Sequence, residues 1–497
     1  MGSRIELPLR ISTDLEENIR AISAATATSM DVVVRRFDLG NGQKAAVFFI
    51  DGLVNKDILG RDFLGPLMAA VKDGYWTAGE LASSVIHTSE VDMVEEFSTV
   101  VESVLQGLVG LFIDGSSTAL TVEVISWPQR SVGEPETDVV IRGPREGFIE
   151  GVRMNVALLR RKIHHPDFTV ETVRLGRYSQ TDVCLVYVSS IVNQGALELA
   201  RQRLSEIDID GVMDTGVIEQ LVQDTPFSLF PTMGVAEKPD IAASRLLEGR
   251  IAILADGSPI ALTIPMLFVE GLQNSEDYYT RFYYASWLRI IRFIAFVVNL
   301  YLPGFFLAAV GFHQQIIPFK LLLSMSAAES VTPFSTGASM LLIWLVYDIL
   351  REAGVRLPRP AGQAISIVGA IVMGDAAVNA NLISAPVLIV LAITIVASFV
   401  NSAYTDASSI LRLLFLGLGW LMGLFGLLLG SLVLVVYLCS LESFGTPFFA
   451  PFGPFLPRQT GDTIIRSPLW MLRFRPSILS RNRRRMADMA PDKGEKS

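Results

Sequence analysis

The most constraining feature of this sequence is the uneven distribution of its charges. From Ile290 to Leu456 there are twelve charged residues in 167 positions, whereas the rest of the chain holds 79 of the 91. Charged side chains are costly in hydrocarbon, so a long segment this poor in charge is typical of membrane-spanning structure. The sequence therefore predicts a soluble part up to residue 285 and a membrane domain over residues 286–456.

The two ends of the chain differ in charge. The tail from Pro457 to Ser497 holds ten Lys+Arg and four Asp+Glu, a net charge of +6. Because the whole chain carries −9, residues 1–456 carry −15. This pattern predicts an acidic soluble domain and a basic tail, 457–497, beside the membrane. The only two cysteines, Cys184 and Cys439, exclude a disulfide framework or a zinc finger.

The soluble part has the pattern of an α/β domain. Charged residues alternate along Met1 to Arg20, and this segment lacks the apolar run that a signal peptide has. We therefore expect the domain in the cytoplasm. Short β-branched runs flank Asn41-Gly42, which is a hairpin signature. Helical periodicity follows over 56–72 and 92–106.

An internal repeat divides this domain. Residues 114–121 (DGSSTALT) return as residues 256–263 (DGSPIALT), with six identities in eight positions, and 49–55 aligns loosely with 187–193. Two unrelated hairpins would give a similar match. We favour a duplication: an N-terminal tail 1–30, two similar α/β subdomains over 31–127 and 147–285, and a linker over 128–146 that is rich in Pro, Gly and charge.

No motif for catalysis is present in the sequence. It has no phosphate-binding glycine loop, no HExxH and no GxSxG. His164-His165 fits the end of a basic helix better than a metal site. We expect no enzyme activity, no bound metal and no cofactor.

Charged residues in and after the linker are candidates for a subunit or subdomain interface, because such a segment joins two folded units. The alternative is a solvated helix with local ion pairs. The candidates are Glu134, Glu136, Arg142, Arg145, Glu146, Arg160 and Arg161.

The membrane domain is predicted to hold four to five helices plus a possible re-entrant element. The apolar segments are 290–312, 337–350, 363–381, 386–403 and 411–440. The last is about 45 Å long as a helix, longer than the ~30 Å hydrocarbon core, so it must tilt, bend at its glycines or fold back. The spacings of Gly419 with Gly423 and of Gly426 with Gly430 favour close helix packing.

If each of these five segments crosses the membrane once, the number of crossings is odd. The arginines of the tail place it in the cytoplasm with the N-terminal domain, which requires an even number. One segment is re-entrant, or 411–440 crosses twice with a partner in 444–455, or the tail lies outside. We favour a re-entrant element within 313–350, where Pro318 and Pro333 interrupt the apolar pattern.

The third apolar segment carries polar groups at membrane depth, which are costly unless they face protein or water. A ring of such helices would form an apolar constriction beside a polar vestibule, the arrangement of a gated cation path. The alternative is a buried packing helix. The pore-lining candidates are Ser366, Ile367, Val368, Ile371, Val372, Asp375 and Asn379.

Several motifs together resemble the A subunits of the GerA family of spore nutrient germinant receptors. They are FFIDGLVNKD at 48–57, EPETDVVIRGPREGF at 134–148, the stretch 237–259, EDYY at 276–279, 351–378 and SFGTPFFAP at 443–451. The resemblance runs from about residue 37 to residue 476.

The resemblance implies a multi-pass protein of the spore inner membrane that acts with a permease-like B subunit and a lipoprotein C subunit. It also implies a homo-oligomeric ring, of five copies, that forms a nutrient-gated channel for monovalent cations in membrane lipid and binds no nucleic acid. Other functions that fit the sequence are a SpoVAF-type accessory germination channel, a secondary transporter, and a membrane scaffold without its own conductance.

Overall fold

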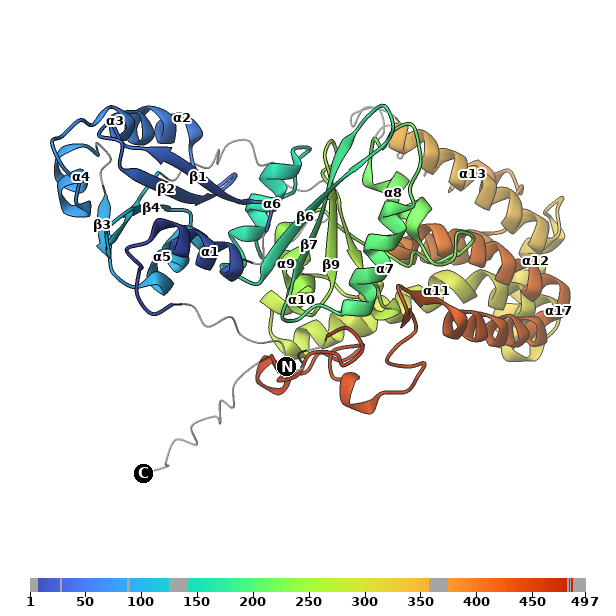
Figure 1. Ribbon diagram of the computed structural model, residues 1–497. Helices are drawn as coiled ribbons and strands as arrows, with labels where there is room; N and C mark the ends of the chain where they lie inside the picture. Colours follow the sequence, from blue (N-terminus) through green and yellow to red (C-terminus); the bar gives the residue numbers. More distant parts are fainter. Residues whose placement is uncertain are drawn as a thin grey trace, which may run out of the picture.

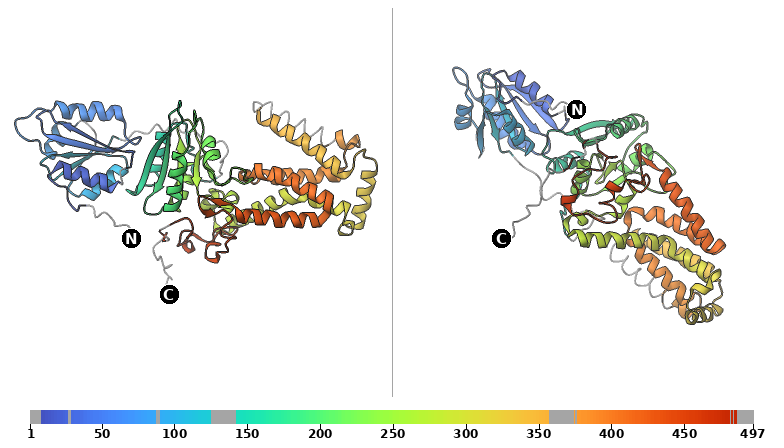
Figure 2. Two further views of the ribbon diagram at one scale, coloured as in Figure 1. Left: turned by 45° about the vertical axis from the view of Figure 1, so that its right-hand side comes forward. Right: turned by 90° about the horizontal axis from the view of Figure 1, so that it is seen from below.

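The computed structural model describes residues 8–26, 29–86, 90–124, 142–356, 374, 376–480, 482 and 484–485. Figure 1 shows an α/β half at the N-terminal end and a helical half at the other. In the left view of Figure 2 two sheets and the helical half follow one another along the molecule.

The first sheet is antiparallel, with strand order β1-β2-β4-β5-β3. Its strands are β1 (Val32–Asp38), β2 (Lys44–Ile50), β3 (Val91–Val94), β4 (Val109–Ile113) and β5 (Ala119–Val122). Successive residues of β2 point to opposite faces and all but the first are buried, so both faces of the sheet are covered. One face packs on α1 (Leu15–Ala25) and α5 (Phe97–Leu105). The other packs on α2 (Lys56–Ile58), the π-helical turn Leu59–Leu64, α3 (Gly65–Ala69) and α4 (Ala78–Ser84).

The second sheet is also antiparallel and has the same strand order, β6-β7-β9-β10-β8. Its strands are β6 (Phe168–Leu175), β7 (Thr181–Val188), β8 (Gly234–Ala236), β9 (Ile251–Ala255) and β10 (Ala261–Ile264). One face packs on α6 (Val152–Arg160) and α9 (Pro239–Leu247). The opposite face packs on α7 (Gln194–Ser205) and α8 (Thr215–Val222).

The segments that repeat in the sequence occupy equivalent places in the two sheets. Asp114-Gly115 turns β4 into β5 and Asp256-Gly257 turns β9 into β10, with both glycines at positive φ. Asn55 and Asn193 cap the helices that follow β2 and β7. The predicted Asn41-Gly42 hairpin joins β1 to β2. The helical periodicity over 92–106 was wrong at its start, where β3 completes the first sheet before α5 begins.

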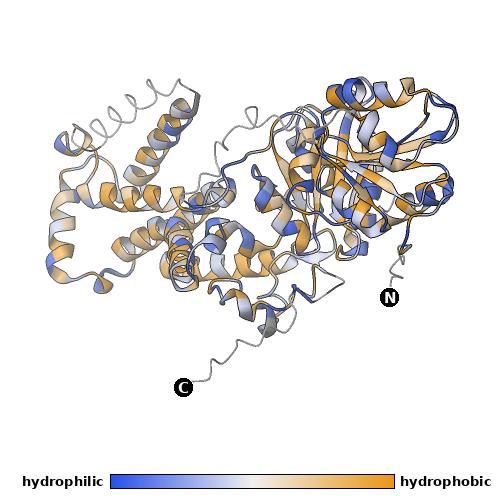
Figure 3. Cartoon of the chain, turned by 90° about the vertical axis from the view of Figure 1, so that its left-hand side faces the viewer, coloured by the Kyte–Doolittle hydropathy of each residue, from blue (hydrophilic) through white to orange (hydrophobic). Residues whose placement is uncertain are grey.

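The helical half begins with the 3₁₀ turn Phe268–Leu272 and α10 (Glu276–Tyr279). Its helices are α11 (Phe282–Gly311), α12 (Phe319–Ser330), α13 (Thr336–Arg356), α15 (Ala377–Asn379), α16 (Ala385–Phe399) and α17 (Thr405–Ser440). Apolar residues dominate these helices (Figure 3). Within the described ranges, α11 and α17 are the two helices long and apolar enough to cross a membrane, and α16 is a shorter apolar helix.

Helix α17 folds back on itself at Gly423, whose φ of 64° and ψ of −145° interrupt the helix. A Cβ on Gly430 would touch Phe415 and Leu418, so the segments before and after the break lie antiparallel. Both views of Figure 2 show two orange-red helical arms side by side. Of the alternatives left by the sequence, folding back is the one adopted within 411–440. The stretch 444–455 supplies no partner helix, because it holds the end of a short β-hairpin, β11 (Glu442–Ser443) with β12 (Thr446–Pro447), and turns.

After α17 the chain returns to the second subdomain. Phe444 is buried in the core beneath α7 and α8. Further along, Leu479 is fully buried, and Ser480 pairs with Val192 and donates a hydrogen bond to the Ile191 carbonyl at 3.0 Å. The tail up to residue 480 therefore lies on the same side of the helical half as the two sheets.

Candidate functional site

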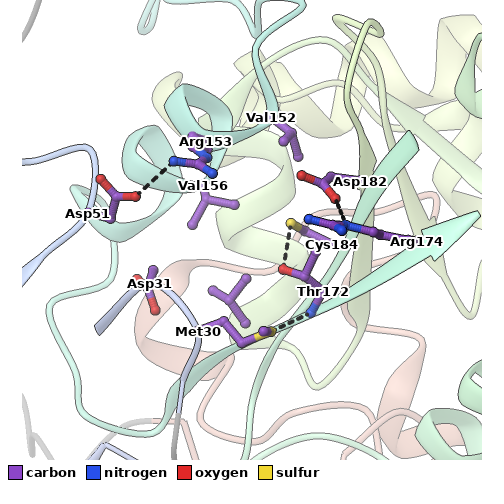
Figure 4. Close-up of a pocket in the computed structure, with 11 residues that line it drawn as sticks. Met30, Asp31, Asp51, Val152, Arg153, Val156, Thr172, Arg174, Asp182 and Cys184 are labelled. Carbon is purple, nitrogen blue, oxygen red and sulfur yellow. Dashed lines mark hydrogen bonds and ion pairs between the residues drawn. The ribbon is translucent and has the colours of Figure 1, made fainter. Parts of the chain in front are cut away.

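A cleft of about 410 Å³ lies between the two subdomains (Figure 4). Apolar residues including Met30, Val156 and Val170 line it. Two ion pairs also line it, Arg153 with Asp51 at 3.5 Å and Arg174 with Asp182 at 3.0 Å. This volume is within the range of small-molecule sites, and its mixed lining suits binding of a small polar or zwitterionic molecule.

Beside this cleft a buried ion pair joins the subdomains. Arg160 of α6 donates to both carboxylate oxygens of Asp31, at 2.9 and 2.8 Å, and both side chains are at least 95% buried. The guanidinium also lies 4.3 Å from the centroid of the Phe168 ring. Ser29 bonds to Asp31 and accepts from the Val170 backbone. Burial lowers the pKa of Arg160, and the neighbouring Asp31 carboxylate opposes this shift.

Cys184 is the thiol that lines the cleft. Burial raises the pKa of Cys184, whose sulfur lies 3.4 Å from the Thr172 hydroxyl, so the thiol is protonated and a poor nucleophile. Across the part of the chain that the structure describes, no group of three or more His, Cys, Asp or Glu side chains has the arrangement of a metal site.

The structure describes five of the seven interface candidates from the sequence. Arg160 lies at the subdomain boundary, as described above. Arg161 and Lys162 instead pair with Glu146, at 3.5 and 3.1 Å, on the surface of the second subdomain. Arg142 and Arg145 are exposed. Glu134 and Glu136 lie outside the described residues.

Most of the pore candidates also lie outside the described residues: Ser366, Ile367, Val368, Ile371, Val372 and Asp375. Asn379 is described, at the exposed end of α15. Its neighbours Ala377 and Val378 pack against a cluster from α13 and α16 that includes Trp344 and Val387.

A second cluster, at the base of α11, was not predicted as a site. Asp277 of α10 is fully buried and accepts from Arg289 at 2.9 Å and from Arg292 at 2.8 Å. Asp462 of the tail accepts from Arg289 at 2.8 Å and from the Tyr278 hydroxyl at 2.8 Å. Burial raises the pKa of Tyr278, so the phenol remains a donor. This network fixes α10, α11 and the tail to one another.

Two residues attach the α17 hairpin to its surroundings. Tyr404, at the start of the hairpin, is fully buried, stacks on Phe268 with ring centroids 5.2 Å apart, and donates to the Phe268 carbonyl. Arg412 is 1% exposed, donates to Asn299 of α11 at 2.8 Å and lies 3.5 Å from the centroid of the Trp344 ring of α13. The sequence showed Arg412 only as a rare charge in an apolar segment.

Comparison with protein families identifies the chain. Residues 20–478 match the model for the Bacillus/Clostridium GerA spore germination proteins. The chain belongs to the GerA family. The resemblance noted from the sequence motifs is therefore confirmed over nearly the whole chain.

Curated GerA-family relatives match along almost the full length. Spore germination protein KA of Bacillus subtilis (strain 168) is 37% identical over 96% of this chain and 88% of its own length. Spore germination protein GerLA of Bacillus cereus is 34% identical, with coverage of 96% and 97%. The crystal structure of the N-terminal domain of the A subunit of the Bacillus megaterium spore germinant receptor GerK3 is 29% identical. It covers 52% of this chain and 98% of its own, with a TM-score of 0.40.

Proposed function

We propose that this GerA-family chain is the A subunit of a spore nutrient germinant receptor and forms, as a ring of copies in the spore inner membrane, a nutrient-gated cation channel. The match to spore germination proteins over residues 20–478 is the observation that carries the germination role. The subunit works with a permease-like B subunit and a lipoprotein C subunit.

The path of the chain supports an even number of membrane crossings. Helix α11 leaves the soluble half, and Asn401, after α16, donates to the Arg292 carbonyl at its base. The α17 hairpin then begins at Tyr404, beside Phe268, and ends at Leu441 in the same buried cluster. Each of its arms, 405–422 and 424–440, spans about 25 Å, close to the ~30 Å hydrocarbon core. In this topology the hairpin crosses twice, and the sheets and tail are both cytoplasmic.

The proposed cation path is lined by the third apolar segment. Val368 and Val372 form its constriction and Asp375 its charged vestibule, by the alternation of apolar and polar residues in the sequence. The sparse polar residues of this segment are costly in lipid, which supports their facing a water-filled path.

Spores carrying single substitutions test this proposal. Val368→Ala or Val372→Ala widens the constriction, so we expect potassium release and germination without nutrient. The matched control is Val436→Ala, at an exposed position of α17, which should leave dormancy intact. Spores that lack the chain should lose the response to one nutrient class.

Two results would count against the proposal. Dormant, potassium-tight spores with both valine substitutions would exclude these residues as the constriction. If spores that lack the chain germinate more slowly with every nutrient but still respond to all of them, the chain is an accessory germination channel instead of a nutrient receptor subunit.

A further inference from the structure

Six large apolar or aromatic side chains are exposed where the tail meets the base of α11. They are Tyr283, Tyr284 and Trp287 of α11 and Trp470, Met471 and Phe474 of the tail, each more than half exposed. We call this set the basal patch. Exposed apolar residues scattered singly are ordinary on a soluble surface, whereas a group drawn from two adjacent segments marks an interaction site.

The two segments of the basal patch are held together. The Arg466 backbone N–H donates to the Ser286 hydroxyl at 3.1 Å, and that hydroxyl donates to the Arg466 carbonyl at 3.2 Å. The rings of Phe282 and Trp470 meet edge to face with centroids 6.1 Å apart. The tail therefore lies along the first two turns of α11.

The tail segment is also fixed at both of its ends. Before it, Asp462 is bonded to Arg289 and Tyr278 in the network at the base of α11. After it, Arg475 donates to the Leu247 carbonyl at 2.6 Å, and Leu479 is buried. A segment anchored in this way presents Trp470, Met471 and Phe474 outward at low entropic cost.

The basal patch is continuous with the lipid-facing stripe of α11. Tyr284, Trp287, Ile291 and Ile294 follow one another at helical spacing and are all exposed. Phe282, which contacts Trp470, lies about 7.5 Å along the helix before Trp287. The headgroup layer is about 5–7 Å thick on each side of the hydrocarbon core, so the basal patch spans this layer.

The composition of the basal patch matches that of a membrane interface. Tyr and Trp are enriched at the headgroup level, where one end of the side chain is apolar and the other wet. Arg281 precedes the aromatic residues of α11, Arg473 lies between Met471 and Phe474, and the tail as a whole carries +6. A basic segment beside a membrane is attracted to anionic lipid.

We propose that the basal patch is a docking surface for the anionic headgroup layer of the membrane, so that residues 470–474 of the tail lie in the interface and bind acidic phospholipid. This inference rests on the proposed membrane topology.

Single cysteines in the full chain test it. Cys184 is buried, so a Cys439→Ser background leaves one reactive thiol per variant. Trp470→Cys reports on the basal patch and Ile294→Cys on the membrane-spanning part of α11. Tyr75→Cys, between α3 and α4, reports on the first subdomain, and these two helices lie far from α11 in Figure 1. Each is labelled with an environment-sensitive fluorophore and reconstituted in phosphatidylcholine vesicles with or without phosphatidylglycerol. Quenching by lipids with nitroxides in the headgroup or in the acyl chain is then measured.

We expect headgroup nitroxides to quench the label at position 470 several-fold more than the label at position 75, and more strongly when phosphatidylglycerol is present. Acyl-chain nitroxides should quench the label at position 294. Arg473→Gln should weaken the dependence on phosphatidylglycerol at position 470.

The controls separate two kinds of failure. If the label at position 294 is not quenched, the proposed topology is wrong and the docking surface falls with it. If position 294 is quenched but position 470 behaves like position 75, only the lipid docking surface is excluded. A label at position 470 that is shielded from water yet not quenched by lipid would overturn the inference in favour of a protein partner.

Discussion

At the residue scale, the contact between Asp31 and Arg160 has the largest predicted effect on stability. Asp31→Ala would leave the Arg160 guanidinium buried without its counter-charge. Breaking a buried ion pair in this way costs about 3–5 kcal/mol. We expect a marked fall in the denaturant midpoint of the purified full chain in detergent.

Arg153→Ala is the matched control, because it removes a neighbouring ion pair whose arginine side chain is 74% exposed. Exposed pairs contribute about 0–1 kcal/mol, so this change should shift the midpoint little. If the two substitutions destabilise the chain equally, the buried pair does not hold the subdomains together.

Glu80 gives a pH-dependent prediction at the same scale. Its carboxylate accepts from Lys72 and from the Thr77 backbone and hydroxyl at the start of α4, which lowers its pKa from 4.5 to about 2. A lowered folded-state pKa adds stability above pH 4.5, and this stability is lost as the pH falls towards 2. Glu80→Gln should therefore lower the denaturant midpoint at neutral pH. The difference from the native chain should shrink across this window, and a constant difference would show that ionisation of Glu80 is not the cause.

At the scale of elements, glycines set how closely α11 and α17 approach. A Cβ on Gly419 would overlap the Gly304 carbonyl, whereas a Cβ on Gly417 would meet open space. Overpacking of this kind costs about 1–3 kcal/mol. Gly419→Ala should lower the thermal stability of the helical half in detergent. Gly417→Ala should leave it unchanged or raise it, since alanine favours helix by up to about 1 kcal/mol. Equal effects would mean that the contact with Gly304 does not set the helix separation.

At the scale of the whole molecule, the α17 hairpin gives a prediction about sidedness. Met422 lies beside the turn at Gly423, and Cys439 lies near the end of the second arm. In sealed vesicles with the sheets inside, an impermeant maleimide should label Met422→Cys, made in a Cys439→Ser background. It should fail to reach Cys439 of the native chain or Tyr75→Cys until detergent opens the vesicles. Labelling of Cys439 from outside would mean a single crossing.

Several features of the fold were predictable because local signals and global structure agree. Each Asp-Gly turn, at 114 and at 256, required a positive φ at its glycine. The repeat of this turn predicted two similar subdomains. Gly419 and Gly423 shared a spacing typical of helix packing, yet their roles differ. Gly419 meets Gly304, a contact between residues far apart in the chain, while Gly423 is the turn. Spacing alone does not distinguish a contact from a turn.

The sequence by itself determined the division into an α/β half and an apolar half, the repeat that predicts two similar subdomains, and the absence of enzyme motifs. These follow from hydropathy, turn chemistry and local residue patterns. Only the tertiary structure decided that Asp31 pairs with Arg160, that Asp277, Arg289 and Asp462 meet at the base of α11, and that α17 doubles back. Those contacts join segments distant in the chain, and their free energy comes from burial and packing that exist only once the segments have come together.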